Sequence, residues 1–179
     1  ASALQSLLNN IATDLDCAQA SSVAHARERL RPWFESADKP RLQVHAIGHA
    51  HIDLAWRWPI RETIRKGART LATVLYNLER YPEYVFGCSQ PQLFVWIREH
   101  HPELYRRIRT AVQTGGIEPQ GTFWVEPDCN MPSGESFVRQ ILHGARFFRE
   151  EFGVESSYCW EPDVFGYHGQ LPQILRRSG

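Results

Sequence analysis

The sequence predicts an α/β fold built around a parallel β-sheet with crossover helices. Short apolar segments alternate with longer segments whose apolar residues recur at helical spacing. This alternation repeats four times after residue 40, which is typical of successive strand and helix pairs. Four βα units do not close a barrel. We therefore expect part of a larger β/α barrel, and an open doubly wound sheet is the competing fold.

The first 40 residues are expected to form a short helical segment and a linker. Two runs within residues 1–35 have helical spacing. Their apolar positions are Leu4, Leu7, Leu8, Ile11 and Leu15, followed by Val23, Ala26, Leu30, Trp33 and Phe34. The stretch ESADKPR then breaks the pattern at Pro40. We therefore assign residues 1–40 to the N-terminal segment and linker, and residues 41–179 to the α/β domain.

The strands and helices of the domain are expected in a regular order. Strands are expected within residues 41–53, 84–90, 116–128 and 156–163. Helices are expected over residues 61–80, over residues 91–113 with a break at Pro102, over residues 133–152 and within residues 169–179. The first helix should bury the face formed by Ile64, Ala68, Leu71, Ala72, Leu75 and Leu78. The helix over residues 133–152 should bury Val138, Ile141, Leu142, Ala145 and Phe148.

The charge balance, the apolar runs and the cysteines indicate which partners and which cell compartment to expect. Twenty basic and twenty acidic side chains cancel, and no basic patch indicates nucleic acid or a membrane surface as a partner. No apolar run approaches the roughly 20 residues of a membrane span, and the first residues lack the basic region of a signal peptide. The four cysteines are scattered, without a C-x-x-C pair, which predicts reduced thiols in a cytoplasmic protein.

Candidate metal ligands lie at the end of the first predicted strand, in the stretch GHAHIDLAWRW. Alternation along a strand places His45, His49, His51 and Asp53 on one face, with the last two at its C-terminal end. Parallel α/β folds place their active sites at that end. An imidazole and a carboxylate two residues apart can reach one zinc ion. Taken alone, such a pair is more often a turn cap beside a hydrogen-bonded histidine.

Two further strands repeat the pattern. The fourth predicted strand ends at Asp163, and the third ends with Glu126 and Asp128. Each strand that ends in an acid also has a tryptophan within a few residues. Aromatic faces beside carboxylates suit the C–H faces and hydroxyls of sugars. This repetition favours a shared carbohydrate site over chance. His49 and Gln90 are further candidates, as a residue that orients a ligand and as a hydroxyl donor, whereas a core position is expected for His45.

The segments AHIDLAW, WVEPDCNMPSGESFVRQ and WEPDVFGY together resemble the N-terminal part of the catalytic domain of the family 38 glycoside hydrolases, which are α-mannosidases. The PSGES segment is similar to the cytosolic and bacterial branch of this family. The resemblance implies a seven-stranded β/α barrel that holds one divalent metal ion, usually zinc. The substrate would be a terminal α-D-mannosyl residue of an oligosaccharide.

The resemblance also implies roles for individual residues. His51, Asp53 and Asp163 would be metal ligands, and Asp163 would also be the nucleophile of a retaining mechanism. Trp56 would stack on the sugar and Phe165 would line the same subsite. We assign Asp128 to the substrate site as well, and Glu126 either to it or to the support of the ligands.

The resemblance leaves part of the active site unassigned. The family's general acid and a fourth metal ligand, a histidine, are expected beyond Gly179. We therefore expect weak metal binding and no useful turnover from these 179 residues alone. An exposed sheet edge would favour self-association, so a homo-oligomer is an open option.

Two other functions remain open at this point. A metal-dependent deacetylase of polysaccharides would also use aspartate and histidine, but it needs an H-x-x-x-H pair, and none follows the third predicted strand. A non-catalytic carbohydrate-binding module would use the tryptophans alone. That module would bind sugar in the presence of a chelator and after Asp163→Asn.

Overall fold

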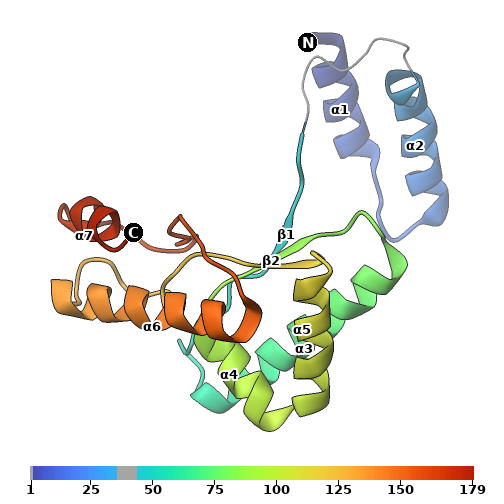
Figure 1. Cartoon of the computed structure of the whole chain (residues 1–179). Coiled ribbons are helices and arrows are strands. Elements are labelled where there is room, and N and C mark those ends of the chain that lie inside the picture. Colours follow the sequence, from blue (N-terminus) through green and yellow to red (C-terminus); the bar gives the residue numbers. More distant parts are fainter. Residues whose placement is uncertain (1, 36–43) are drawn as a thin grey trace. The chain divides into compact units, whose positions relative to one another are not determined.

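The computed structural model describes residues 2–35 and 44–179, and the chain divides into two compact units, Ala1–His45 and Ala46–Gly179 (Figure 1). The first unit contains α1 (Ser2–Asp14) and α2 (Ala20–Phe34), which confirms the two predicted helices. An ion pair of 3.2 Å between Arg29 and Asp14 joins them. The linker expected at residues 36–40 and the start of the first predicted strand lie outside the described residues.

The second unit is built on a parallel sheet, as predicted. Its strands β1 (Gly48–His49), β2 (Phe86–Cys88) and β3 (Ile117–Pro119) pair in the order β1-β2-β3. In the register, Phe86 lies opposite Gly48 on one side and opposite Ile117 on the other. The connections between these strands are helical. All three strands therefore present their C-terminal ends at the same edge, where the predicted ligands follow.

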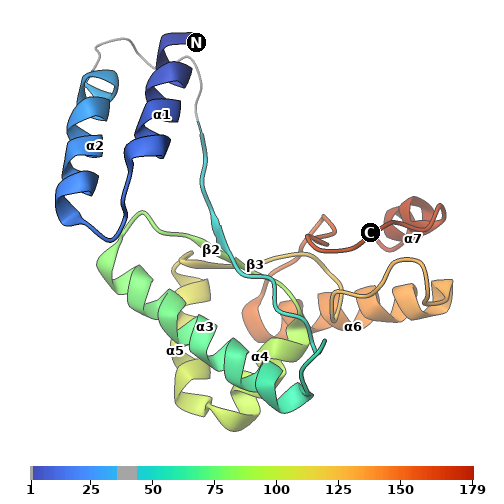
Figure 2. The same ribbon diagram turned by 180° about the vertical axis from the view of Figure 1, so that it is seen from behind.

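The helices of this unit confirm the predicted positions. They are α3 (Ile60–Arg80), α4 (Pro91–His100), α5 (Pro102–Gln113), α6 (Gly134–Phe152) and α7 (Leu171–Arg177). Helix α4 ends where Pro102 begins α5, because proline has no N–H to continue the helix but fits its first turn. Helices α3, α4 and α5 pack together beside the sheet (Figure 2). None of the helices within the described ranges is long and apolar enough to cross a membrane.

The core lies between these helices and the sheet. Its fully buried side chains include Phe94, Ile97, Ile108, Ile117 and Phe148. The faces of two helices differ from prediction. Helix α3 buries Thr63, Gly67, Leu71, Val74 and Leu75, and leaves Ala72 exposed. Helix α6 buries Phe137, Ile141, Gly144, Phe147 and Phe148, whereas Val138 and Leu142 are exposed. Each buried face includes a glycine at a close contact, Gly67 in α3 and Gly144 in α6, and the spacing of apolar residues does not select glycines.

The fourth predicted strand, residues 156–163, is not a strand in the structure. The backbone of β3 gives a reason. Phe86 N–H donates to the carbonyl of Gly116, and Gln120 N–H donates to the carbonyl of Cys88. The backbone groups of Gly116 and Gln120, which are even-numbered residues of the third segment, therefore point toward β2. The backbone of Pro119, an odd-numbered residue, points to the other side of β3, where a further strand would pair. Because proline has no N–H, it cannot donate a hydrogen bond to that strand. The fourth segment instead contacts β3 through the Tyr158 hydroxyl, which donates to the carboxylate of Glu118 at 2.9 Å.

Candidate metal centre

Three predicted ligands meet beyond the C-terminal ends of the strands. His51 and Asp53 lie just after β1, and Asp163 comes from the segment between α6 and α7. His51 Nε2 lies 3.2 Å from Asp53 Oδ1 and 3.5 Å from Asp163 Oδ2. One possible ligand atom from each of the three residues lies within 4.8 Å of the others. The structure therefore brings together side chains from two segments that are far apart in the sequence.

Glu126 joins these segments. Its side chain is 5% exposed, and its two oxygens accept different hydrogen bonds. Oε2 lies 2.7 Å from His51 Nδ1, and Oε1 accepts the backbone N–H of Asp163 at 2.7 Å. A carboxylate that accepts from one ring nitrogen of a histidine fixes which way the other nitrogen points. Glu126 therefore directs His51 Nε2 toward Asp53 and Asp163.

The electrostatics of this cluster suit a cation. With Nδ1 donating to Glu126, a neutral His51 turns the lone pair of Nε2 toward two carboxylates. A proton on Nε2 or a cation between the three groups removes this repulsion. Burial lowers the pKa of His51, but the carboxylates of Asp53 and Glu126 outweigh burial and raise that pKa above its ordinary value of 6.5.

The donor set also fits a metal ion by its chemistry. One imidazole nitrogen and two carboxylate oxygens are ordinary ligands of zinc, which binds such atoms at about 2.0–2.2 Å. Donor atoms separated by 3.2 and 3.5 Å can share an ion at that distance. His51, Asp53 and Asp163 are therefore the residues that would hold a metal here.

The backbone of Asp53 is tied to the start of α3. The Thr63 hydroxyl donates to the Asp53 carbonyl at 3.0 Å, and the Trp58 indole N–H donates to Thr63 Oγ1 at 2.9 Å. Thr63 is fully buried. These two hydrogen bonds give a role to the hydroxyl of a buried threonine in the first turn of α3, which a large apolar residue could not fill.

The predicted substrate residues are accessible. Trp56 is 64% exposed and Phe165 is 91% exposed. The Trp56 ring packs edge-on against Trp58 at 5.6 Å between centroids, and the Arg57 guanidinium lies 5.0 Å from the centre of the Trp56 ring. These contacts hold one side of Trp56 in place and leave much of its surface open to solvent.

Asp128 lies in the loop that follows Glu126. Its Oδ1 accepts the N–H groups of Asn130 and Met131 at 2.7 and 2.8 Å, and these two bonds hold the pKa of its carboxyl below the ordinary value. Both bonds use the same oxygen, so Oδ2 has no hydrogen-bond partner from the described residues.

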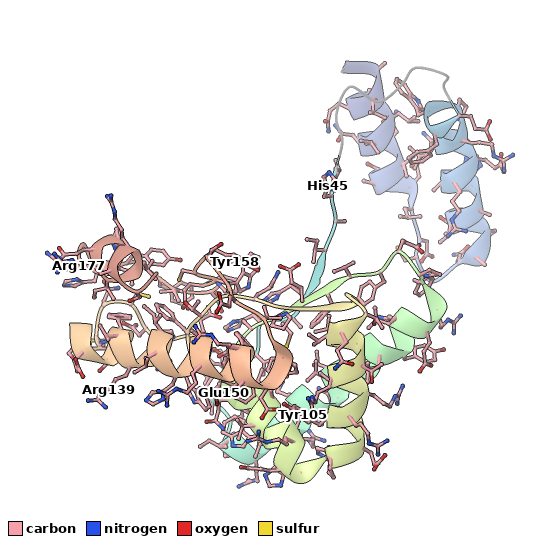
Figure 3. All side chains as sticks on the ribbon, viewed as in Figure 1. His45, Tyr105, Arg139, Glu150, Tyr158 and Arg177 are labelled. Carbon is pink, nitrogen blue, oxygen red and sulfur yellow. The ribbon has the colours of Figure 1, made fainter. Side chains whose placement is uncertain are left out.

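The two other predicted histidines have different surroundings. His49 Nδ1 lies 3.0 Å from the carbonyl of Gly87, and its Nε2 accepts from the Trp160 indole at 3.5 Å. Both ring nitrogens are thus used away from the three ligands. His45 is exposed in the segment before β1, so the core position predicted for it is wrong (Figure 3). Strand β1 begins only at Gly48, so the alternation of side chains between the two faces of a strand does not apply to His45.

Sequence reasoning missed Glu161. Both of its carboxylate oxygens are buried without a hydrogen-bond partner among the described residues. Burial, together with the nearby charge of Glu126, raises its pKa to about 9. The stretch WEPD contained the residue, but only the folded chain shows that this acid turns inward while Asp163 lies in the cluster.

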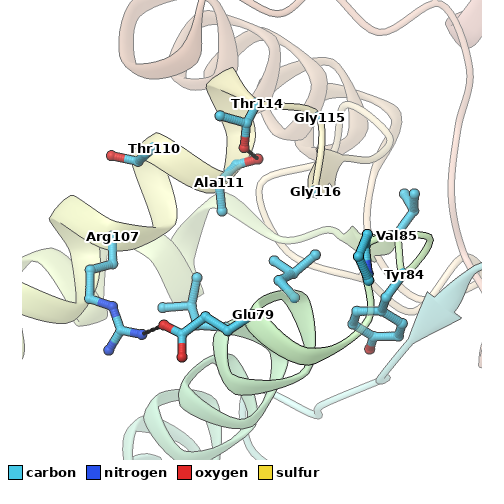
Figure 4. Close-up of a pocket in the computed structure, with 12 residues that line it drawn as sticks. Glu79, Tyr84, Val85, Arg107, Thr110, Ala111, Thr114, Gly115 and Gly116 are labelled. Atoms are coloured by element: carbon cyan, nitrogen blue, oxygen red, sulfur yellow. Dashed lines mark hydrogen bonds and ion pairs between the residues drawn. The ribbon is translucent and has the colours of Figure 1, made fainter.

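A separate hollow lies at the opposite ends of the strands. It has a volume of about 450 Å³ and includes Tyr84 and Val85, before β2, and Gly115 and Gly116, before β3 (Figure 4). An ion pair of 2.8 Å between Arg107 and Glu79 lies at its side. In parallel α/β folds this end of the sheet serves stability more than chemistry, so the ligand cluster is the better candidate for function.

Comparison with known proteins gives matches over most of the chain. Residues 41–179 match the N-terminal domain of the glycosyl hydrolases of family 38. The chain is 51% identical to human alpha-mannosidase 2C1 over 136 residues, which are 76% of this chain and 13% of that protein. It is 41% identical to the Saccharomyces cerevisiae alpha-mannosidase over 172 residues, covering 89% of this chain and 16% of the yeast protein.

A solved structure agrees with these matches. The crystal structure of an alpha-mannosidase from Enterococcus faecalis superimposes with a TM-score of 0.67 and 28% identity, over 74% of this chain and 15% of the bacterial one. The chain thus spans less than one fifth of the length of these relatives. The matched domain and the identity to these relatives show that this chain belongs to glycosyl hydrolase family 38.

Proposed function

We propose that the chain supplies the metal-binding and nucleophile-bearing part of a retaining α-mannosidase. The observation that carries the proposal is the meeting of His51, Asp53 and Asp163 at the strand ends of a family 38 chain. The substrate would be a terminal α-D-mannosyl residue of an oligosaccharide, and the ion would be zinc. The three parallel strands would form part of a seven-stranded β/α barrel.

Each ligand residue has a defined task in this proposal. His51 Nε2, Asp53 and Asp163 would hold the ion, which when bound supplies a positive site for two neighbouring sugar hydroxyls. The Asp163 carboxylate would attack the anomeric carbon and form a covalent glycosyl–enzyme, while the glycosidic C–O bond breaks and the general acid protonates the departing oxygen. Water would then hydrolyse the intermediate and free the carboxylate. Glu126 supports this role because its hydrogen bond to the Asp163 N–H fixes the backbone that carries the nucleophile.

The sugar would be held by residues around the cluster. The exposed faces of Trp56 and Phe165 suit stacking against the apolar face of a pyranose ring. The unpaired Oδ2 of Asp128 would accept a hydrogen bond from a sugar hydroxyl. We propose that the general acid and a fourth ligand, a histidine, come from sequence beyond these 179 residues. A cytoplasmic location is part of the proposal, and the four free cysteines support it.

The proposal is tested with a polypeptide that carries these residues and has the length of the curated relatives. It should hydrolyse an aryl α-mannoside and release α-mannose as the first product, as detected by NMR. Asp163→Asn should lower kcat/KM by at least about 1,000-fold, because it removes the nucleophile. A chelator should abolish activity and zinc should restore it, whereas the 179-residue chain alone should show no useful turnover.

A matched control is available on α6. Glu135→Gln removes an exposed acid that pairs with Arg139, and this variant should keep wild-type activity. Release of β-mannose first would contradict the retaining mechanism. Release of acetate would instead indicate a deacetylase. Sugar binding that survives both the chelator and Asp163→Asn, without hydrolysis, would indicate a binding module.

A further inference from the structure

Gln90 has an unusual backbone conformation next to the ligand cluster. It follows β2 by two residues, and its φ of 66° makes it the only non-glycine residue with positive φ in the described part of the chain. The left-handed region costs an ordinary residue roughly 1–2 kcal/mol. Such strain persists where the surroundings fix the residue, and it is common at functional sites. The side chain is almost fully buried, with 4% of the residue exposed.

The helix that begins after Gln90 does not explain why this residue is a glutamine. Its carbonyl accepts the N–H of Leu93, and Pro91 follows as the first residue of α4. A residue before proline avoids the right-handed helical region, but glycine would adopt the observed conformation with less strain. The reason for a glutamine therefore lies in its side chain.

The side-chain amide connects two loops. Nε2 donates to the carbonyl of Ile52 at 2.9 Å, and Oε1 accepts the backbone N–H of Glu126 at 2.9 Å. Ile52 lies between His51 and Asp53, and Glu126 is the residue that binds both His51 and Asp163. The amide supplies the donor and the acceptor that these two bonds need on one short planar group. A carboxylate would repel the Ile52 carbonyl, and an apolar side chain would leave both backbone groups unpaired.

We infer that Gln90 is a positioning residue of the metal centre, which sets the spacing between the loop of His51 and Asp53 and the loop of Glu126. This inference rests on the proposed function. Gln90 acts through backbone groups and through Glu126, and it makes no direct hydrogen bond to the three ligand side chains among the described residues. Loss of its amide would let the two loops move apart, and the ligand atoms would no longer converge.

The test is a comparison of two buried glutamines. Gln90→Met keeps the length and flexibility of the side chain but removes both hydrogen bonds. Gln120→Met is the matched control, because Gln120 follows β3 directly, is 6% exposed, and has an Oε1 without a partner in the described residues. Zinc affinity is measured by competition with a chromophoric chelator. The visible spectrum with cobalt(II) reports the ligand geometry, and the melting temperature of the metal-free protein reports folding.

Gln90→Met should weaken zinc binding by about 10- to 100-fold and change the cobalt spectrum, as removal of groups that support metal ligands typically does. Gln120→Met should leave affinity within about twofold and the spectrum unchanged. If Gln90→Met does not fold, Gln90→Glu keeps the acceptor for the Glu126 N–H and should give a loss in the same direction.

The outcomes separate the inference from the proposed function. Zinc binding that is lost in His51→Ala but unchanged in the Gln90 variants would overturn the inference and leave the proposed centre standing. An equal loss in Gln120→Met, or a lower melting temperature with an unchanged cobalt spectrum, would show that Gln90 has a purely structural role. A wild-type chain that binds no zinc would contradict the proposed centre itself, and the inference with it.

Discussion

One carboxylate, that of Glu126, organises the cluster at the scale of single residues. It accepts from His51 with one oxygen and from the Asp163 backbone with the other, at 2.7 Å in both cases. Its own backbone N–H is held by Gln90. Charge-assisted hydrogen bonds of this length are the stronger kind in proteins. The positions of the ligands therefore depend on residues that need not touch a metal ion or a sugar.

A residue-scale prediction concerns pH and the thiol of Cys88. This side chain lies in β2, and burial raises the pKa of its thiol from the ordinary 9.0 to about 12. The stabilising effect of a neutral buried thiol is complete below pH 9 and is lost as the pH rises through the folded value of about 12. The free energy of unfolding should therefore fall between pH 8 and about pH 10.5, with about 2 kcal/mol due to Cys88.

The measurement is chemical denaturation of wild type and of Cys88→Ala at both pH values. The variant is expected to be less stable at pH 8 because it leaves a small cavity, but it should lose less stability on going to high pH. An equal loss in both proteins would show that the Cys88 thiol does not titrate as its burial predicts.

At the scale of secondary structure, helix α6 holds the loop that carries Glu126. It begins after Ser133, whose hydroxyl accepts the Ser136 N–H. Gln140 on this helix accepts the N–H of Trp124 with its carbonyl and that of Val125 with its side chain. The helix can approach the loop this closely because residue 144 is a glycine. An added Cβ there would lie 1.9 Å from the carbonyl oxygen of Thr122.

This contact predicts a large effect of Gly144→Ala. The methyl group would collide with backbone rather than with a movable side chain, so α6 would have to shift and the variant should lose about 3 kcal/mol of stability. Gly134→Ala on the same helix is the control, because its Cβ would meet Ile174 at an ordinary 3.6 Å. Thermal denaturation of both variants tests this, and similar melting temperatures would contradict it.

The sequence predicted the elements better than their contacts. Helices α3 to α7 follow from apolar spacing and from the break at Pro102, both of which are local signals. The buried faces were partly misplaced because Gly67 and Gly144 lie at close contacts that depend on a distant partner. The fourth strand failed for a similar reason, since pairing depends on hydrogen-bond groups of the neighbouring strand.

In the site, too, the sequence indicated which residues take part but not the contacts between distant segments. The motifs indicated His51, Asp53 and Asp163, and the structure brings them together. The support by Glu126 was only one of two options, and the link through Gln90 was not expected, because both depend on the distance between two loops. Strand alternation cannot give that distance. The inward position of Glu161 likewise depends on the path of the chain after α6.

At the scale of the whole molecule, the chain is a small part of a family 38 architecture. It spans 13% of the human relative and 16% of the yeast relative, yet it contains three of the four proposed ligands of the metal. Two sequence segments, one after β1 and one after α6, must both be in place for these ligands to meet. Metal binding is therefore a property of the assembled sheet edge and reports directly on whether the fold places the site as proposed.

The most direct measurement is the zinc content of the 179-residue chain, determined by mass spectrometry after equilibrium dialysis against excess zinc. The excess is needed because a chain without the fourth proposed ligand should bind the ion weakly. Wild type is compared with the double variant His51→Ala/Asp163→Ala. The proposed centre predicts about one bound zinc per wild-type chain and its loss in the double variant, because two of three ligands are removed. Equal zinc content in the two proteins, or none in the wild type, would contradict it.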